Sequence, residues 1–142
     1  MTTHQSWANI GIVAAGGAVG TGSRYLITLF VPTWAGIPLA TLGINVVGAF
    51  LVGLLLELLA SHRPVTDWSR RIRLGLGTGS LGGFTTYSAL ATETVTLGST
   101  HPGLAIGYAL GTVIIGAAAT IAGIWLARCL PPPTLDNRQR KT

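Results

Sequence analysis

Hydrophobic residues occupy long stretches of this chain, and short polar links separate them. No Asp, Glu, Lys or Arg lies at positions 25–56, 74–92 or 94–127. A helix needs about 20 mostly apolar residues to cross the hydrocarbon core of a bilayer. The pattern therefore predicts an all-α membrane protein with four transmembrane helices, over about residues 8–30, 38–60, 71–97 and 102–128.

The composition supports a membrane protein and limits where its charge can lie. Only 9% of the residues are charged, which is too few to cover the surface of a soluble enzyme. Prolines at positions 131–133 end the last predicted helix, because proline lacks the amide hydrogen. We expect a membrane domain over residues 1–130 and a disordered basic tail over 131–142. The net charge of +5 then belongs to links and tail rather than to a nucleic-acid surface.

The third predicted span differs from the others because glycine is dense in it. Five glycines and then a threonine pair follow one another closely: Gly75, Gly77, Gly79, Gly82, Gly83, Thr85 and Thr86. Glycine disfavours helix by about 1 kcal/mol relative to alanine. Non-helical backbone persists at membrane depth only where protein buries it or where it lines a cavity. We therefore expect the third helix to be broken at this Gly-rich and Thr-Thr segment; the alternative is an intact helix with a glycine-lined packing face.

Two other glycine pairs have the spacing of helix contacts. Gly16 and Gly20 are four residues apart, as are Gly107 and Gly111. Small residues at this spacing let helix backbones approach closely in lipid. Because four short spans enclose a polar path poorly, we expect close packing at both pairs and an oligomer.

Basic residues fall almost entirely on one side of the predicted topology. With four spans, both termini and the link between the second and third spans share a side. That side holds eight of the nine basic residues: Arg63, Arg70, Arg71, Arg73, Arg128, Arg138, Arg140 and Lys141. Since Lys and Arg are enriched in cytoplasmic loops, we expect a multi-pass protein of the cell membrane with both termini in the cytoplasm.

Neutral polar side chains recur at helical spacing within the spans. Thr41 and Asn45 are four residues apart, as are Tyr108 and Thr112, so each pair shares a helix face. The whole set of donors comprises Thr41, Asn45, Thr85, Thr86, Ser88, Tyr108 and Thr112. Such hydroxyl and amide groups suit a small anion that must exchange its water. The alternative for Asn45 is a hydrogen bond between helices that holds packing.

Charged residues inside the spans are few, and none forms a catalytic pattern. Arg24 in the first span either reaches a water-filled vestibule or anchors the chain at the interface. Glu93 either braces the broken helix or marks the approaching interface. No acid or base is patterned with a nucleophile, and the three histidines lack the spacing of metal ligands. We therefore expect a transport protein rather than an enzyme.

Three segments give the sequence a resemblance to the Fluc family of fluoride channels, also called CrcB. They are GGAVGTGSRY at 16–25, PLATLGINVVGAF at 38–50 and GSLGGFTTYSAL at 79–90. The resemblance implies a fluoride-specific channel that lowers cytoplasmic fluoride by passive efflux, built as an antiparallel dimer with two pores at the subunit interface. It also implies a structural, non-transported Na⁺ at the dimer centre, held by the backbone carbonyls of Gly82 and Thr85.

The same resemblance assigns further residues. Asn45 corresponds to a pore asparagine and Arg24 to a vestibule arginine. The other pore-lining or supporting positions are Thr41, Thr86, Ser88, Tyr108, Thr112 and Glu93. The family usually carries two pore phenylalanines three residues apart, and this chain has Tyr87 and Leu90 there. Tyrosine keeps a ring whose positive edge can meet an anion, whereas leucine offers none.

The one-sided charge conflicts with a homodimer whose subunits insert in opposite orientations. We hypothesise that the chain pairs with a homologous chain of the opposite charge bias. The main rival function is a small proton-coupled multidrug-type transporter of four spans, which needs a membrane-embedded carboxylate. The first span contains none. A third possibility is a membrane scaffold that transports nothing.

Overall fold

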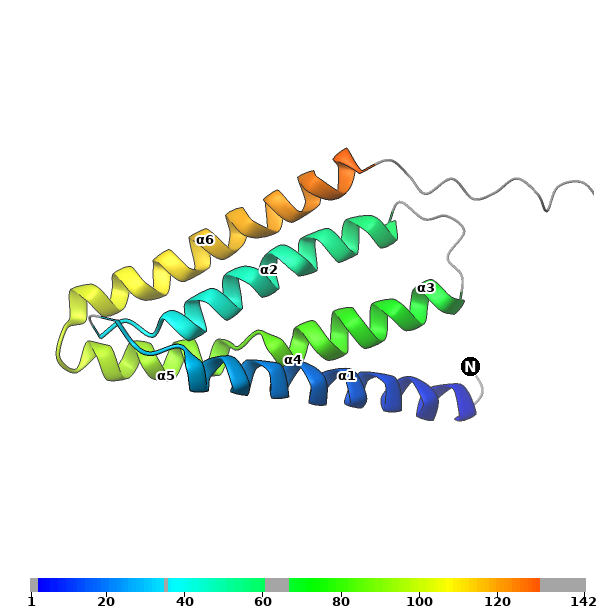
Figure 1. Ribbon diagram of the computed structural model, residues 1–142, viewed down its shortest axis with the longest axis horizontal. Coiled ribbons are helices and arrows are strands. Elements are labelled where there is room, and N and C mark those ends of the chain that lie inside the picture. The colour runs from blue at the N-terminus through cyan, green and yellow to red at the C-terminus, as the bar shows by residue number, and fades with distance from the viewer. Residues whose placement is uncertain (1–2, 35, 61–66, 131–142) are drawn as a thin grey trace, which may run out of the picture.

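Three long helices form most of the structure. The computed structural model describes residues 3–34, 36–60 and 67–130. The long helices are α1 (Thr3–Phe30), α2 (Leu39–Ala60) and α6 (Pro102–Cys129) (Figure 1). Within the described residues, these three are long and apolar enough to cross a membrane. Their positions agree with the first, second and fourth predicted spans, whereas the expected tail over 131–142 lies outside the described residues.

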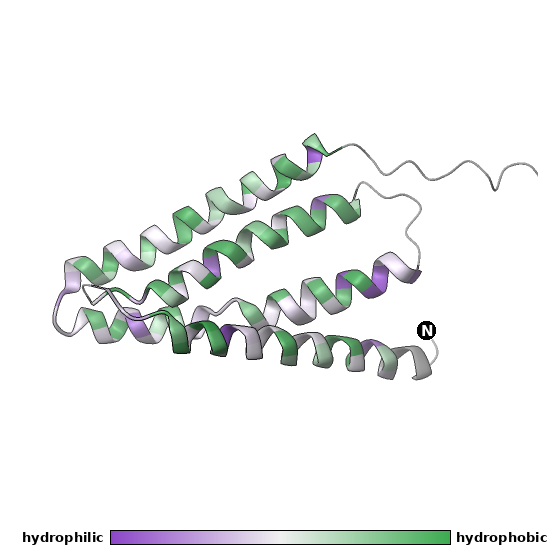
Figure 2. Ribbon diagram, viewed as in Figure 1, coloured by the Kyte–Doolittle hydropathy of each residue, from purple (hydrophilic) through white to green (hydrophobic). Residues whose placement is uncertain are grey.

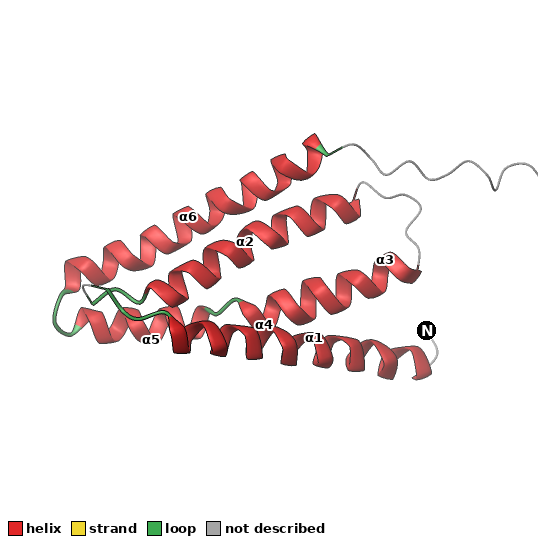
Figure 3. Cartoon of the chain, in the orientation of Figure 1, coloured by secondary structure: helices red, strands yellow, loops and turns green. Residues whose placement is uncertain are grey.

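The remaining predicted span, 71–97, is divided into short helical pieces. They are α3 (Asp67–Ile72), the wider π-helix η1 (Arg73–Leu81), α4 (Gly82–Phe84) and α5 (Tyr87–Gly98). The first three follow one another without a gap, so the glycine-rich stretch itself is helical. The helical path stops instead at Thr85 and Thr86, which have extended backbones with ψ of 153° and 114°. Figure 3 shows this interruption as a loop between α4 and α5.

The hydroxyl groups of the two threonines explain why the interruption falls on them. Thr85 Oγ1 donates to the carbonyl of Leu81 at 3.0 Å. Thr86 is the N-cap of α5, since its Oγ1 accepts a hydrogen bond from the N–H of Ala89 at 3.2 Å. Such local bonds between side chain and backbone compete with continuous helix.

Glycines bring the helices together in two pairs. Along the first pair, α1 lies beside η1 and α4. A methyl group on Gly16 or Gly20 would overlap the backbone carbonyl of Gly75 or Ser80, so α1 and η1 are in direct backbone contact. In the second pair, α2 lies beside α6, and Gly53 and Gly123 bring those backbones together in the same way.

The expected role of the other glycine pair is wrong within this chain. Apart from the neighbouring backbone of α6 itself, no atom of the described chain lies within 4 Å of the position that a methyl group on Gly107 or Gly111 would take. The glycines of α6 that contact α2 lie further along the helix, at Gly116 and Gly123. Spacing alone could not separate these sets, because α6 carries glycines on more than one face.

The outer surface of the bundle is apolar, as a lipid environment requires. Large side chains such as Ile114 and Ile121 are exposed, whereas the buried core cluster is small and consists of Leu90, Leu97, Ala105 and Tyr108. Hydrophobic residues dominate α2 and α6, and hydrophilic residues gather at α3 (Figure 2). The start of α1, the end of α2, α3 and the end of α6 all lie at one end of the bundle (Figure 1). At this end Arg128 Nε pairs with Glu57 Oε1 at 2.8 Å and links α6 to α2.

Candidate functional site

Two hydrogen bonds hold Asn45 of α2 against the interruption between α4 and α5. Asn45 Oδ1 accepts from the N–H of Thr86 at 2.8 Å. Asn45 Nδ2 donates to the C=O of the same residue at 3.0 Å. Because Thr86 lies outside any helix, these backbone groups need partners in a water-poor environment. We call this pair of bonds the Asn45–Thr86 bracket; it shows how extended backbone is satisfied between helices.

The bracket leaves one amide hydrogen of Asn45 without a partner in the described chain, since the NH₂ group carries two. Asn45 lines an open groove of about 360 Å³ at the surface of α2, α5 and α6. The polar lining residues are Asn45, Thr85, Thr86, Tyr87, Thr112 and Thr120. Apolar residues form the other walls, and no lining residue is charged. The hydroxyls of Thr85, Thr112 and Thr120 already donate to backbone carbonyls. The donor that the groove offers to a solute is therefore the second amide hydrogen of Asn45.

A second polar cluster lies one helical turn earlier on α2. Thr41 Oγ1 donates to Glu93 Oε1 at 2.6 Å, and the Tyr108 hydroxyl donates to Glu93 Oε2 at 2.7 Å. Thr41 and Tyr108 are buried, and Glu93 also lines a separate hollow of about 460 Å³ together with His101 and several threonines. Glu93 thus joins α5 to α2 and α6. The hydroxyl hydrogens of Thr41 and Tyr108 therefore point at Glu93 rather than at a passing solute.

The interruption also frees two backbone carbonyls. In a continuous helix, the carbonyls of Gly82 and Thr85 would accept from the N–H groups four residues later, those of Thr86 and Ala89. Here Asn45 Oδ1 takes the Thr86 N–H, and Thr86 Oγ1 takes the Ala89 N–H. The carbonyl of Gly83, between them, accepts from Thr21 Oγ1 at 3.3 Å. Gly82 and Thr85 therefore keep oxygen atoms without their helical donors.

The remaining expected site residues lie at different distances from the groove. Tyr87 stands at its rim and is 80% exposed, while Leu90 lines it from within the buried cluster. Ser88 Oγ lies 3.3 Å from Thr86 Oγ1, and Thr112 Oγ1 donates to the Tyr108 carbonyl at 2.7 Å. Arg24 belongs to α1, which contributes no residue to the groove.

One groove residue, Thr120, was not expected from the sequence. Its Oγ1 donates to the carbonyl of Ala49 on α2 at 3.2 Å, and the residue lines the groove. Thr112, Gly116 and Thr120 are spaced by four residues along α6, so they share one face. That spacing extends the Tyr108 and Thr112 pattern and could have indicated the position.

Comparison with known proteins settles the family. The family model described as CrcB-like protein, Camphor Resistance (CrcB), matches residues 11–124. The chain belongs to the CrcB-like family. The resemblance noted in the sequence is thereby confirmed, and the match includes Asn45 and the interruption between α4 and α5.

Individual CrcB-like relatives support the same assignment. The chain is 48% identical over 120 residues to fluoride-specific ion channel FluC 2 of Leifsonia xyli subsp. xyli, covering 84% of this chain and 83% of that protein. It is 42% identical over 125 residues to fluoride-specific ion channel FluC of Agrobacterium fabrum, covering 86% and 98%. A third relative, FluC 1 of Cutibacterium acnes, is 44% identical over 125 residues, covering 85% and 86%. These relatives are named as channels, which agrees with the expectation that the family is not enzymatic.

Proposed function

We propose that this chain is a subunit of a fluoride channel that lowers cytoplasmic fluoride by passive efflux. The observation that carries the proposal is the uncharged groove at the Asn45–Thr86 bracket, in which Asn45 keeps a free amide hydrogen. We infer that the anion is fluoride because the relatives are named fluoride-specific ion channels. A site for an organic cation would need acidic groups, and the groove has none.

Neutral donors suit rapid conduction of a small anion. Fluoride enters the groove by exchanging water for the free amide hydrogen of Asn45. A threonine hydroxyl of the lining serves as a second donor only when it rotates away from its backbone carbonyl. No arginine or lysine lines the groove to trap it, and weak, repeated sites favour exit as well as entry. A membrane potential of 100 mV contributes about 2.3 kcal/mol per charge, so no pump is required.

The groove is open on one side, so one subunit does not complete a pore. Tyr87 at the rim is mostly exposed and is positioned to face a second subunit. We assign the partner as a CrcB-like chain in the opposite orientation, with α3 to α5 acting together as the third span of each subunit. In this arrangement the basic end of the present chain, where α1 begins and α6 ends, faces the cytoplasm.

The freed carbonyls of Gly82 and Thr85 fit a structural Na⁺. Unwound helix carbonyls are ligands of this kind in membrane proteins. Two oxygen atoms from one chain are too few for a sodium ion, and the second subunit would supply the others. The ion would hold the two interruptions together and would not cross the membrane.

Sodium removal tests this assignment. Replacing Na⁺ on both sides with N-methylglucamine should lower fluoride efflux from vesicles at least tenfold, because this cation is too large for backbone carbonyls to surround. Fluoride-electrode recordings in matched salts measure the effect, and restored Na⁺ should restore efflux. Equal efflux in both salts would contradict a structural role for sodium.

The charge distribution makes a heteromeric pair the proposed form of the channel. Eight basic residues on one side and none on the other favour a single orientation. A suitable partner can be made from the chain itself. Arg63, Arg70, Arg71, Arg73, Arg138, Arg140 and Lys141 are replaced with Ser, and Ser99 and Thr100 with Lys, which leaves one basic residue, Arg128, on the original side and places two on the other. This charge-inverted copy should insert in the opposite orientation.

Co-expression with the inverted copy tests the pair. We expect fluoride-sensitive bacterial cells without an exporter to gain fluoride resistance from both chains together and little from either chain alone. Resistance conferred by the present chain alone, at the level of the pair, would contradict the heteromeric form and leave the channel assignment intact. No resistance from the pair, with both chains present in the membrane, would contradict the channel assignment itself.

The two rival functions fit the structure less well. A proton-coupled transporter needs a carboxylate that is free to exchange protons for cations. The candidate, Glu93, is occupied by hydroxyl donors from two helices. A scaffold that transports nothing does not account for an uncharged groove lined by Asn45 with a free amide hydrogen. Neither rival agrees with the names of the relatives.

A further inference from the structure

Three arginines at one end of the bundle form no ion pair with a carboxylate of the described residues. Arg70 and Arg71 belong to α3, and Arg73 begins η1. Arg71 and Arg73 are exposed, and Arg70 is half-buried. Among residues 67–130 and the other described ranges, the ion pair of Arg128 with Glu57 is the only one between a guanidinium and a carboxylate. Asp67 is the acidic residue that lines a hollow with Arg70 and Arg71, so the three guanidinium groups keep a net positive charge at this end.

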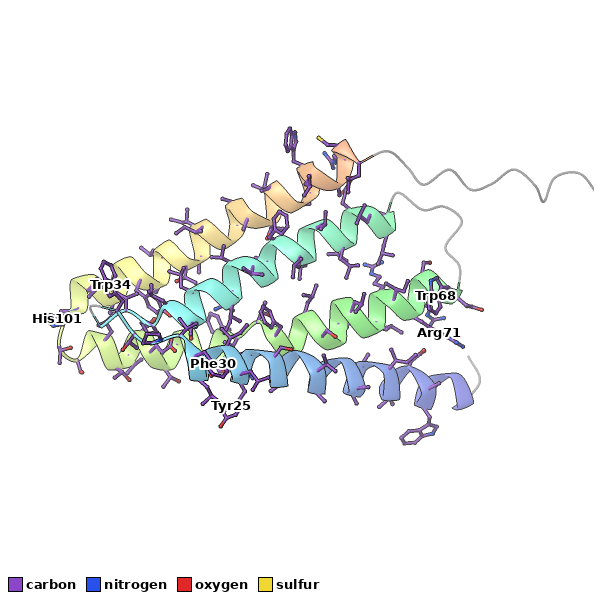
Figure 4. All side chains as sticks on the ribbon, in the orientation of Figure 1. Tyr25, Phe30, Trp34, Trp68, Arg71 and His101 are labelled. Atoms are coloured by element: carbon purple, nitrogen blue, oxygen red, sulfur yellow. The ribbon has the colours of Figure 1, made fainter. Side chains whose placement is uncertain are left out.

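Exposed tryptophans place this charge at the level of lipid headgroups. Trp7 of α1, Trp68 of α3 and Trp125 of α6 are 69%, 71% and 68% exposed, and each lies within two turns of a helix end at the same end of the bundle. Figure 4 labels both Trp68 and Arg71 at this end of the bundle, on α3. Tryptophan is enriched where membrane meets water. The arginines next to it therefore lie where phosphate groups are available.

The side of these arginines that borders α1 is marked by a hollow with room for about one water molecule. This hollow of about 30 Å³ lies between α1 and α3, and Asn9, Arg70 and Arg71 line it together with Ala8 and Asp67. Guanidinium groups bind phosphate through paired N–H donors, and an amide adds a further donor. We propose that this face, made by Trp68, Arg70, Arg71 and Arg73 beside Asn9, binds the headgroup phosphate of an anionic phospholipid.

The site goes beyond the proposed fluoride pathway and does not depend on conduction. It is built on α1, α3 and η1, whereas the groove is built on α2, α5 and α6. A bound lipid would hold α3 at the membrane surface next to α1. A chain that conducts no fluoride could still bind lipid at this site. A chain that binds no lipid here could still conduct fluoride.

Lipid selectivity of the full chain in vesicles tests the proposal. We expect spin-labelled phosphatidylglycerol to associate with the protein in preference to spin-labelled phosphatidylcholine, as the motionally restricted fraction of each label reports. One arginine near an anionic surface contributes about 1 kcal/mol, or roughly fivefold. The Arg71→Gln variant should therefore lower the preference by up to about fivefold, and Arg71→Lys should retain most of it.

Arg128→Gln is the matched control, because Arg128 is exposed at the same end but already pairs with Glu57. We expect it to leave the preference unchanged within twofold. An equal loss in Arg71→Gln and Arg128→Gln would contradict a site and indicate only general charge attraction. Preference that persists when Arg70, Arg71 and Arg73 are all replaced with Gln would also overturn the proposal. Loss of the preference on adding millimolar inorganic phosphate at constant ionic strength would assign the site to free phosphate instead.

Discussion

Replacing Asn45 with Asp should abolish fluoride efflux. The carboxylate removes the Nδ2 donor and places an oxygen against the carbonyl of Thr86, which now lies 3.0 Å from Nδ2. It also places a negative charge in a groove that has no basic residue. At an effective dielectric constant of 20, a charge about 4 Å from a second one costs about 4 kcal/mol. Anion occupancy, and with it efflux, should fall about a thousandfold.

A second variant separates charge from local structure. Asn45→Ala removes the Asn45–Thr86 bracket without adding charge, and an unsatisfied backbone group costs about 1–3 kcal/mol. We expect this variant to conduct about 10- to 100-fold less than the wild type, and more than Asn45→Asp. Fluoride-electrode recordings from vesicles containing equal amounts of each protein measure the order. Wild-type efflux in a correctly folded Asn45→Asp protein would remove Asn45 from the pathway.

The second large effect concerns packing, and Gly20 is its most sensitive position. A methyl group at Gly20 would overlap the carbonyl of Ser80 and crowd the N–H of Phe84, both of which are backbone atoms. Neither can move unless η1 and α4 move away from α1. Overpacking of this kind costs about 3 kcal/mol, so Gly20→Ala should lose most of its stability despite the better helix propensity of alanine.

Gly22 provides the matched control on the same helix. Apart from the neighbouring backbone of α1 itself, no atom of the described chain lies within 4 Å of a methyl group at that position. Gly22→Ala should therefore be as stable as the wild type or slightly more stable. Thermal unfolding in detergent, followed by tryptophan fluorescence with size-exclusion profiles, compares the two variants. Equal unfolding temperatures for Gly20→Ala and Gly22→Ala would show that α1 does not contact η1 as closely as the structure indicates.

The sequence was most informative where a residue had few alternatives. A stretch of about 20 or more apolar residues without charge indicates a membrane helix. Three of the predicted spans agree with the observed helices to within a few residues. The periodicity also placed Thr41 and Asn45 on one face, and both side chains bond to the segment around α5. That the amide of Asn45 spans both backbone groups of Thr86 could not be predicted, because it depends on how α2 meets a segment 41 residues later.

Glycine was the least informative residue because it serves two purposes. The dense glycines of η1 suggest a weak helix by propensity, yet they remain helical because α1 packs directly against them. Helix contacts outweigh the intrinsic preference here, whereas two threonine hydroxyls suffice to end the helix where they cap the next one. The same ambiguity explains Gly107 and Gly111, whose spacing suggests a contact that this chain does not make.

The central claim is that the groove at Asn45 conducts fluoride selectively. Its most direct test is the efflux of fluoride and of chloride, measured in parallel with ion-selective electrodes, from vesicles that contain the chain and its charge-inverted copy. We predict rapid fluoride loss, chloride loss no greater than from protein-free vesicles, and no fluoride loss when both chains carry Asn45→Asp. Fluoride efflux equal to that of protein-free vesicles, or chloride efflux as rapid as fluoride efflux, would contradict the claim.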